Sequence, residues 1–462
     1  MKSLLSVFIL FCSLCLKCQE IDSLKLREIY DFNLQQSNCY ENLRSLCKDV
    51  GHRLSGSKSA QKAVEWAELL MKNSNLDTVY LQQIIVPHWE RGDIEKVYWK
   101  NINGETVDVN CTALGGSVST NGIVNGEVVE IKNWGQLEEF GKNKIKGKII
   151  FFNRVMNPTF INTGMAYGSC VDQRHSGASR AVEYGAIGVL VRSMTLKFDN
   201  IPHTGSMSYA DSTKKIPAVA ISTVDAHNLS EALKNNELKH LSMELSCKQL
   251  DDTSSYNVIG EIKGQEFPDE IILVGGHLDS WDIGEGAHDD GAGVVQSLQV
   301  LETFKKLKLK SKRTLRCVMY MNEENGNRGG KHYASMVRKT GEKHLFALES
   351  DRGGFSPRGF SIDGTKIQLE YLQSFEKLFK PYQLHVFSEG YSGVDIGPLK
   401  DGKLCLVGLI PDSQRYFDFH HSKADVFENV HKRELELGAS AISSIVYLVD
   451  KYGLPENKSL KK

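Results

Sequence analysis

Side chains that can bind metal ions follow several predicted strands in the last two-fifths of the chain. They occur in the segments His277-Leu-Asp279, His288-Asp-Asp290, Asn322-Glu-Glu-Asn325, Glu349-Ser-Asp351 and His420-His421. Imidazole and carboxylate groups without thiolates are typical of a catalytic zinc ion that keeps positions open for substrate. Two histidines and three carboxylates are more than one such tetrahedral ion needs. The set therefore predicts two zinc ions ~3.5–4 Å apart, a spacing at which one carboxylate can bridge them.

The two adjacent glutamates, at 323 and 324, indicate the type of reaction. Neighbouring side chains at the end of a strand point in different directions, so one can bind metal while the other faces the substrate. A carboxylate beside a metal centre can act as the general base on an attacking water. The pattern therefore favours a hydrolase.

A sheet is needed to bring these segments together. Strands are predicted at 270–274, 315–321, 345–348 and 404–410, with a helix at 291–307. This alternation predicts an α/β fold with a largely parallel central sheet and helices on both faces. Ligands of such sheets bind at the carboxyl ends of the strands, which is where the metal-binding segments lie.

The middle of the chain has a different pattern of predicted strands and helices. Apolar strands are predicted at 148–153, 186–191 and 216–221, with a helix at 180–185 that ends in glycine. This order resembles the protease-associated domain, a β-rich insert of many secreted peptidases; the alternative is a continuation of one large sheet. The insert is placed at 114–245, between catalytic parts at 44–113 and 246–455, and a tail follows at 456–462.

The N-terminus predicts a secreted protein. Residues 1–18 contain the apolar run Leu4 to Leu16, which is too short to span a bilayer and suits a signal peptide. Residues 19–43 are either a pro-segment or an N-terminal helix. Glycosylation sequons begin at Asn110, Asn228 and Asn457. After removal of the signal we expect a soluble protein without a membrane span.

Composition excludes some classes of partner and scaffold. The formal net charge is −1, so there is no basic surplus for nucleic acid. Seven cysteines follow the predicted signal peptide, an odd and widely spaced set that does not suit a disulfide scaffold, although Cys39 and Cys47 are close enough in sequence to pair.

The metal-binding segments resemble a known family. HLDSWDIGEGAHDDGAG, NEENGNRGG, ESDRGG and FHHS are similar to the motifs of the co-catalytic two-zinc aminopeptidase and carboxypeptidase family. The resemblance implies exopeptidase activity on dipeptides or short peptides, a homodimer, and secretion or a lysosomal location. It also implies the following zinc ligands: His277, Asp289, Glu324, Asp351 and His421.

The resemblance gives other residues roles around these ligands. Asp289 is the bridging carboxylate, Glu323 is the general acid/base, and Asp279 orients the imidazole of His277. His420 precedes the last ligand, at a position where some relatives have a tyrosine that contacts the oxyanion. A histidine can donate an N–H to the same place. Alternatively, His420 packs into the fold beside Phe417 and Phe419.

Two rival functions fit the same fold. One is a single-zinc enzyme similar to glutaminyl cyclases, which retention of both halves of the ligand set opposes. The other is a non-catalytic, receptor-like relative without metals, which the intact ligands and Glu323 oppose. The number of zinc ions bound per chain separates the three functions.

Overall fold

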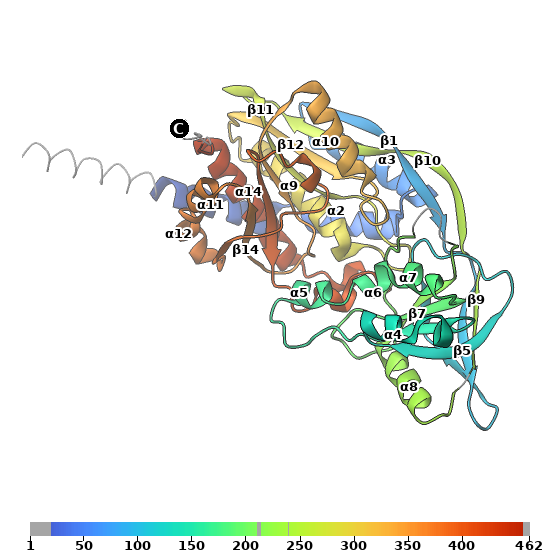
Figure 1. Ribbon diagram of the computed structural model, residues 1–462. Coiled ribbons are helices and arrows are strands. Elements are labelled where there is room, and N and C mark those ends of the chain that lie inside the picture. Colours follow the sequence, from blue (N-terminus) through green and yellow to red (C-terminus); the bar gives the residue numbers. More distant parts are fainter. Residues whose placement is uncertain (1–19, 210–213, 239, 456–462) are drawn as a thin grey trace, which may run out of the picture.

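The computed structural model describes residues 20–209, 214–238 and 240–455. The predicted signal peptide at 1–18 and the tail at 456–462 lie outside these residues. Two eight-stranded sheets lie in two domains, a larger α/β layer and a smaller domain that contains β5, β7 and β9 (Figure 1). The middle of the chain therefore forms its own sheet rather than a continuation of one large sheet.

The main sheet has the strand order β1-β10-β12-β11-β13-β16-β14-β15. The strands are β1 (Thr78–Glu90), β10 (Lys248–Ile262), β11 (Phe267–His277), β12 (Arg313–Tyr320), β13 (Lys343–Glu349), β14 (Pro357–Asp363), β15 (Val386–Glu389) and β16 (Cys405–Pro411). The four central strands β12, β11, β13 and β16 are parallel. β1 pairs antiparallel with β10, β10 with β12 and β14 with β16, whereas β14 and β15 are parallel. The sheet is therefore parallel at its centre and mixed at its edges.

Helices cover both faces of the main sheet, as predicted. The helices α3 (Lys58–Asn73), α9 (Ala292–Lys306) and α14 (Lys432–Tyr452) pack on one face, and α10 (Arg328–Thr340) packs on the other. α9 lies between β11 and α14, which explains why it is buried on nearly all sides. The side chain of Ser57 caps α3 by accepting a hydrogen bond from the backbone N–H of Ala60.

The second sheet has the order β3-β2-β9-β5-β6-β7-β8-β4. Its strands are β2 (Glu95–Lys100), β3 (Thr106–Val109), β4 (Cys111–Ala113), β5 (Val124–Ile131), β6 (Ile149–Phe152), β7 (Gly188–Arg192), β8 (Ala218–Ile221) and β9 (His240–Leu245). This domain starts near Glu95 and so extends beyond the predicted 114–245, because β2, β3 and β4 pair with its other strands. Its identity as a protease-associated domain stays a prediction.

Helices flank the second sheet and fill the remaining layers. They are α4 (Trp134–Ile145), α5 (Thr163–Gly168), α6 (Asp172–His175), α7 (Gly177–Glu183) and α8 (Thr223–Lys234). In the larger domain α2 (Cys39–Ser45), α11 (Lys366–Gln373), α12 (Glu376–Phe379) and α13 (Tyr416–Phe419) complete the fold. α5 contacts α13, so the smaller domain reaches the segment that carries His420 and His421.

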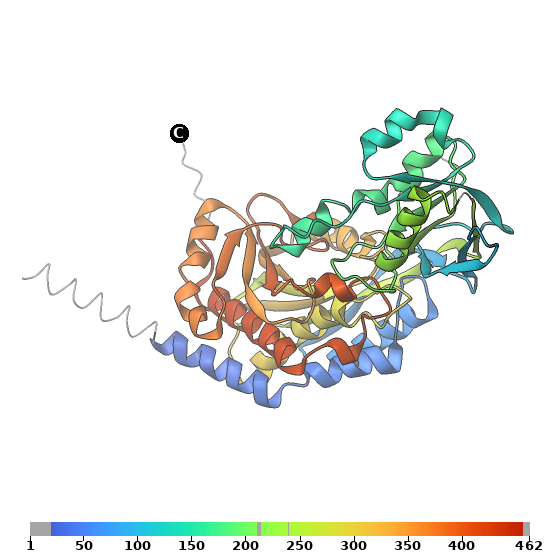
Figure 2. The same cartoon turned by 90° about the horizontal axis from the view of Figure 1, so that it is seen from below.

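The segment predicted at 19–43 is part of the main core from residue 20 onward. Residues 20–36 are helical, and they lie with α2 along the outer side of the larger domain (Figure 2). Leu26, Ile29 and Leu43 are fully buried. The ring of Tyr30 stacks on that of Tyr382 at 3.7 Å. Removal of this segment as a pro-segment would strip these side chains from the core, which favours the N-terminal helix.

The surface and the cysteines bear on three further sequence predictions. Among the described helices, none has both the length and the apolar character needed to cross a bilayer. Asn110 and Asn228 are exposed, whereas Asn457 lies outside the described residues. Cys39 and Cys47 are both buried as free thiols, so the structure does not pair them.

Candidate metal centre

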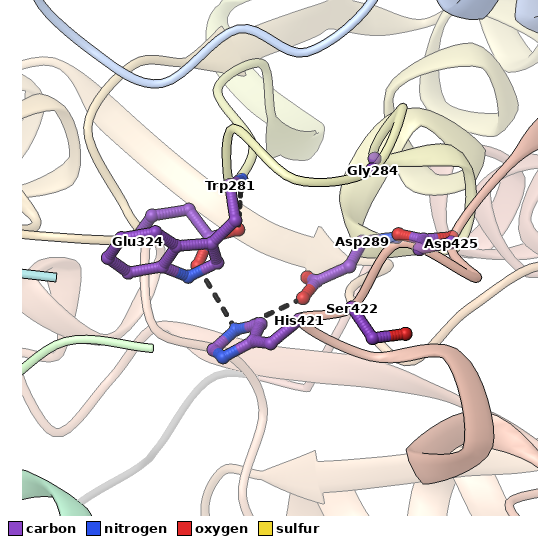
Figure 3. A pocket seen from close by; sticks show the side chains of 8 residues that line it. Trp281, Gly284, Asp289, Glu324, His421, Ser422 and Asp425 are labelled. Atoms are coloured by element: carbon purple, nitrogen blue, oxygen red, sulfur yellow. Dashed lines mark hydrogen bonds and ion pairs between the residues drawn. The ribbon is translucent and has the colours of Figure 1, made fainter. Parts of the chain in front are cut away.

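Each predicted ligand lies where the sequence places it, at the carboxyl edge of the main sheet. His277 is the last residue of β11, Glu324 follows β12 and Asp351 follows β13. Asp289 lies in the turn that precedes α9, and His421 follows α13. Figure 3 shows the side chains of Asp289, Glu324 and His421 pointing toward one another from three different segments.

The two oxygens of Asp289 face two different histidines. Oδ1 lies 3.3 Å from Nε2 of His277, which is itself 3.5 Å from Oδ1 of Asp351. Oδ2 lies 3.2 Å from Nε2 of His421, which is 3.1 Å from Oε2 of Glu324. The five residues therefore form two half-sites, each with one histidine and one carboxylate, that share Asp289.

Two carboxylate oxygens in this centre are buried without a hydrogen bond from any described residue. They are Oδ2 of Asp289 and Oδ1 of Asp351. Buried carboxylates normally have hydrogen-bond or metal partners, because an uncompensated charge away from water is costly. His277 and Asp289 also belong to groups of ligand atoms that lie close enough together to hold a metal ion. The donor set and its orphaned oxygens therefore fit one cation in each half-site.

Asp279 has a different contact from the predicted one. Its backbone carbonyl, not its side chain, accepts from Nδ1 of His277 at 2.9 Å. The carboxylate oxygen Oδ1 lies 3.8 Å from that nitrogen. Instead, Oδ1 accepts from the backbone N–H groups of Asn322 and Glu323, at 2.7 and 3.0 Å. Oδ2 accepts from the backbone N–H of Glu324 at 3.4 Å. The side chain thus positions the turn that carries both glutamates.

Asp425 is a supporting residue that the sequence analysis missed. Its oxygens accept from the backbone N–H of His288 at 2.7 Å and of Asp289 at 3.1 Å. Burial, followed by the charge of Asp289, raises the pKa of Asp425 to about 7. Nothing in the local sequence marks this residue, because its partners lie far away along the chain.

Asp290 is distinguished from Asp289 by its hydrogen bonds. Its carboxylate accepts from the backbone N–H of His277 at 3.0 Å and of Gly293 at 2.9 Å. It therefore ties the end of β11 to the first turn of α9, and leaves Asp289 as the carboxylate that faces both histidines. The peptide bond between Asp289 and Asp290 is cis.

The charged groups of the centre shift one another's pKa values. Burial, followed by the neighbouring charge of Asp289, raises the pKa of Glu324 to about 7. Burial also raises the pKa of Glu323, and Asp351 adds to the rise. Burial alone would lower the pKa of His421, but Glu324 and Asp289 raise it to about 9. The acidic groups outweigh the basic ones, so the centre attracts cations.

His420 lies at the inner edge of an aromatic cluster. Its ring stacks on that of His421 at 3.5 Å and meets the rings of Tyr167 and Phe417, both at 5.2 Å. Its Nε2 lies 3.7 Å from Oδ2 of Asp289. The contact with Phe417 is one of the two that the second predicted alternative names, and the nitrogen points toward the metal centre as the first requires.

Comparisons with known proteins agree on one family. A model of peptidase family M28 matches residues 257–446. Carboxypeptidase Q of Mus musculus is 33% identical over 90% of this chain and 86% of its own length, and that of Homo sapiens is 32% identical over 90% and 85%. A peptidase M28 precursor from Shewanella amazonensis has the same fold at a TM-score of 0.90, with 30% identity over 96% of this chain and 100% of that one. BSAP, a zinc aminopeptidase from Bacillus subtilis, shares the fold at a TM-score of 0.66 and 20% identity, over 89% of this chain and 94% of that one.

Segments beyond the predicted ligands carry the same likeness. The stretches WERG at 89–92 and GYSGVDIGPL at 390–399, together with the inserted domain, resemble carboxypeptidase Q. The predicted relationship is confirmed, since the similarity to carboxypeptidase Q extends over nine-tenths of the chain rather than the motifs alone. The chain is therefore a metallopeptidase and belongs to peptidase family M28.

Proposed function

We propose that the protein is a secreted exopeptidase that uses two zinc ions to hydrolyse dipeptides or short peptides. The observation that carries the proposal is the orientation of the Asp289 carboxylate. One of its oxygens faces His277 and the other faces His421. A single ion would leave one of these half-sites empty. The names of the relatives support the choice of zinc and of exopeptidase activity.

The ligand set divides between the two ions, and the two share Asp289. His277, Asp351 and Oδ1 of Asp289 would hold the first zinc, and His421, Glu324 and Oδ2 of Asp289 the second. Zinc bound there supplies Lewis-acid chemistry, since it acidifies water and polarises a peptide carbonyl. The proton transfers are carried out by side chains of the protein.

Glu323 is the group that moves the proton. Its backbone N–H is fixed by Asp279, and its side chain is only half-buried, so it is accessible to a substrate. The carboxylate takes a proton from the attacking water and then gives it to the nitrogen of the leaving amine. Burial raises the pKa of Glu323, which makes it a better acceptor for the first of these transfers.

The smaller domain supports a preference for short substrates. Tyr167, from α5, lies against His420, so the smaller domain forms a wall beside the metal centre. A chain terminus fits beside such a wall more easily than the middle of a long peptide. Secretion after loss of residues 1–18, glycans at Asn110, Asn228 and Asn457, and a homodimer complete the proposal.

Two zinc ions per chain are the first expected result. Chelation should abolish activity and zinc should restore it, because the buried carboxylates lose their counter-charge when the ions leave. Elemental analysis of purified protein, paired with turnover of a dipeptide panel, measures both. One tightly held ion in fully active protein would favour the single-zinc alternative. No bound metal would favour the receptor-like one.

Substitution of His420 by phenylalanine separates its two roles. If Nε2 donates to the developing oxyanion, turnover falls by ~10²-fold while zinc content and substrate affinity are nearly kept. Phenylalanine preserves the ring contacts with Tyr167 and Phe417, so the aromatic cluster should remain intact. Steady-state kinetics and a thermal melt measure the two effects. Unchanged turnover would show that His420 is a packing residue, whatever the change in thermal stability.

A further inference from the structure

A short segment of the smaller domain pairs with the segment that carries His421. We call residues His203, Thr204 and Gly205 the strap; they lie between β7 and β8. His203 forms an antiparallel bridge with Ser422. The backbone N–H of Thr204 donates to the carbonyl of His421 at 2.8 Å, and Nδ1 of His203 donates to the carbonyl of His420 at 2.7 Å.

The strap also contacts the imidazole of His421 itself. The carbonyl oxygen of Thr204 lies 3.3 Å from Nδ1 of His421. Nη1 of Arg174 lies 3.4 Å from the same nitrogen, so the strap and Arg174 together surround this side of the ring. The other ring nitrogen, Nε2, is thereby directed toward Asp289 and Glu324, where a metal ligand is needed. Arg174, another residue of the smaller domain, donates to the same carbonyl at 3.3 Å.

The strap is fixed within the smaller domain. The backbone N–H of His203 donates to Oγ of Ser193 at 2.8 Å, and Oγ1 of Thr204 donates to the carbonyl of Ala113 at 2.8 Å. Gly205 has a φ of +139°, and a Cβ there would lie 2.3 Å from the guanidinium carbon of Arg174. Only glycine therefore allows the strap and Arg174 to approach this closely.

The other histidine of the metal centre is supported differently. Nδ1 of His277 donates to the carbonyl of Asp279, and its backbone N–H donates to Asp290. Both partners belong to the larger domain. The two half-sites are thus unequal, because one is supported within the larger domain and the other by the strap.

We propose that the strap makes the smaller domain part of the metal centre, with His203 as a positioning residue for the half-site of His421 and Glu324. The inference rests on the proposed two-zinc function. It assigns the smaller domain a role beyond that of a wall beside the substrate. Loosening of the strap should lower the affinity for one zinc ion and leave the affinity for the other unchanged.

Substitutions of His203 test this inference. His203→Leu keeps much of the side-chain volume but cannot donate to the carbonyl of His420. Loss of such a supporting contact weakens metal binding by ~10–100-fold, and we expect that loss for one ion only. His203→Asn, whose amide can donate from nearly the same place, should retain much of the affinity. His227→Leu, an exposed histidine of the same domain, is the matched control.

Zinc titration of the metal-free protein against a competing chelator measures both affinities, and native mass spectrometry counts the ions. The inference is supported if the wild-type protein binds two ions and His203→Leu binds one of them with lower affinity. Equal weakening of both, or no change in either, would overturn it. A wild-type protein that binds fewer than two ions would instead contradict the proposed function.

Hydrogen exchange of the wild-type protein gives a second readout that does not depend on any variant. Metal and strap are linked reciprocally, so the second equivalent of zinc should slow exchange of the Thr204 amide, which donates to His421. The first equivalent should slow it less. Exchange at Thr204 that is indifferent to zinc would also overturn the inference, even if the His203 variants failed to fold.

Discussion

Replacement of Glu323 by glutamine lowers turnover by ~10²–10⁴-fold and leaves both zinc ions bound. Glutamine has nearly the shape of glutamate but cannot accept a proton from water at neutral pH. The backbone N–H that Asp279 holds is unchanged, so the turn keeps its geometry. Substrate affinity should change little, because the carboxylate acts mainly in the transition state.

Turnover number, Michaelis constant and zinc content must be measured on the same preparation of Glu323→Gln. Glu139→Gln, an exposed glutamate on α4, makes the same chemical change away from the centre and should behave as wild type. A fully metallated Glu323→Gln with near-normal turnover would assign the general base to another residue. A variant that loses zinc would show instead that Glu323 binds metal.

The local sequence predicts most of the central architecture. The strands at 270–274 and 315–321 and the helix at 291–307 correspond to β11, β12 and α9. Their continuous apolar runs are those of elements buried on both sides, which a sequence shows directly. His277 ends β11, and Glu324 follows β12 within a few residues. The periodicity and the motif therefore point to the same edge of the sheet.

Contacts between distant segments are what the sequence could not reveal. Asp425 holds Asp289, and Thr204 holds His421, across long stretches of chain and through backbone atoms that carry no sequence signal. The carboxylate of Asp279 was expected at His277, its neighbour in sequence, yet it is used by the turn at Glu323. Proximity along the chain did not predict the contact of this side chain. Asp279 binds the imidazole of His277 through its backbone carbonyl, which leaves the carboxylate free to bind elsewhere.

Domain limits were obscured for a related reason. β2 and β3 are short strands of six and four residues, and no change of composition marks the start of the smaller domain near Glu95. Only their pairing with β9 and with each other assigns them to the second sheet. The antiparallel β1–β10 pair at the edge of the main sheet is likewise a property of pairing, not of periodicity.

The largest loss of metal is expected from Asp289→Asn. An amide has one oxygen where the carboxylate has two, so it can serve the side of His277 or that of His421, but not both. It also removes the negative charge shared by the two half-sites. We therefore expect one zinc ion to be lost and the other to be weakened by more than the ~100-fold that loss of a supporting contact causes. Turnover should fall at least as far as in Glu323→Gln.

Zinc stoichiometry at increasing free zinc, followed by turnover at the highest concentration, provides the measurement for Asp289→Asn. Asp269→Asn, at an exposed position on the larger domain, is the matched control and should keep two ions. Because Asp425 binds the backbone of Asp289 rather than its side chain, the turn before α9 should keep its shape in the variant. A loss of zinc would therefore be caused by the missing carboxylate and not by a change in the shape of the turn. Two ions held at wild-type affinity would show that Asp289 does not bridge them, and the two half-sites would then need another shared ligand.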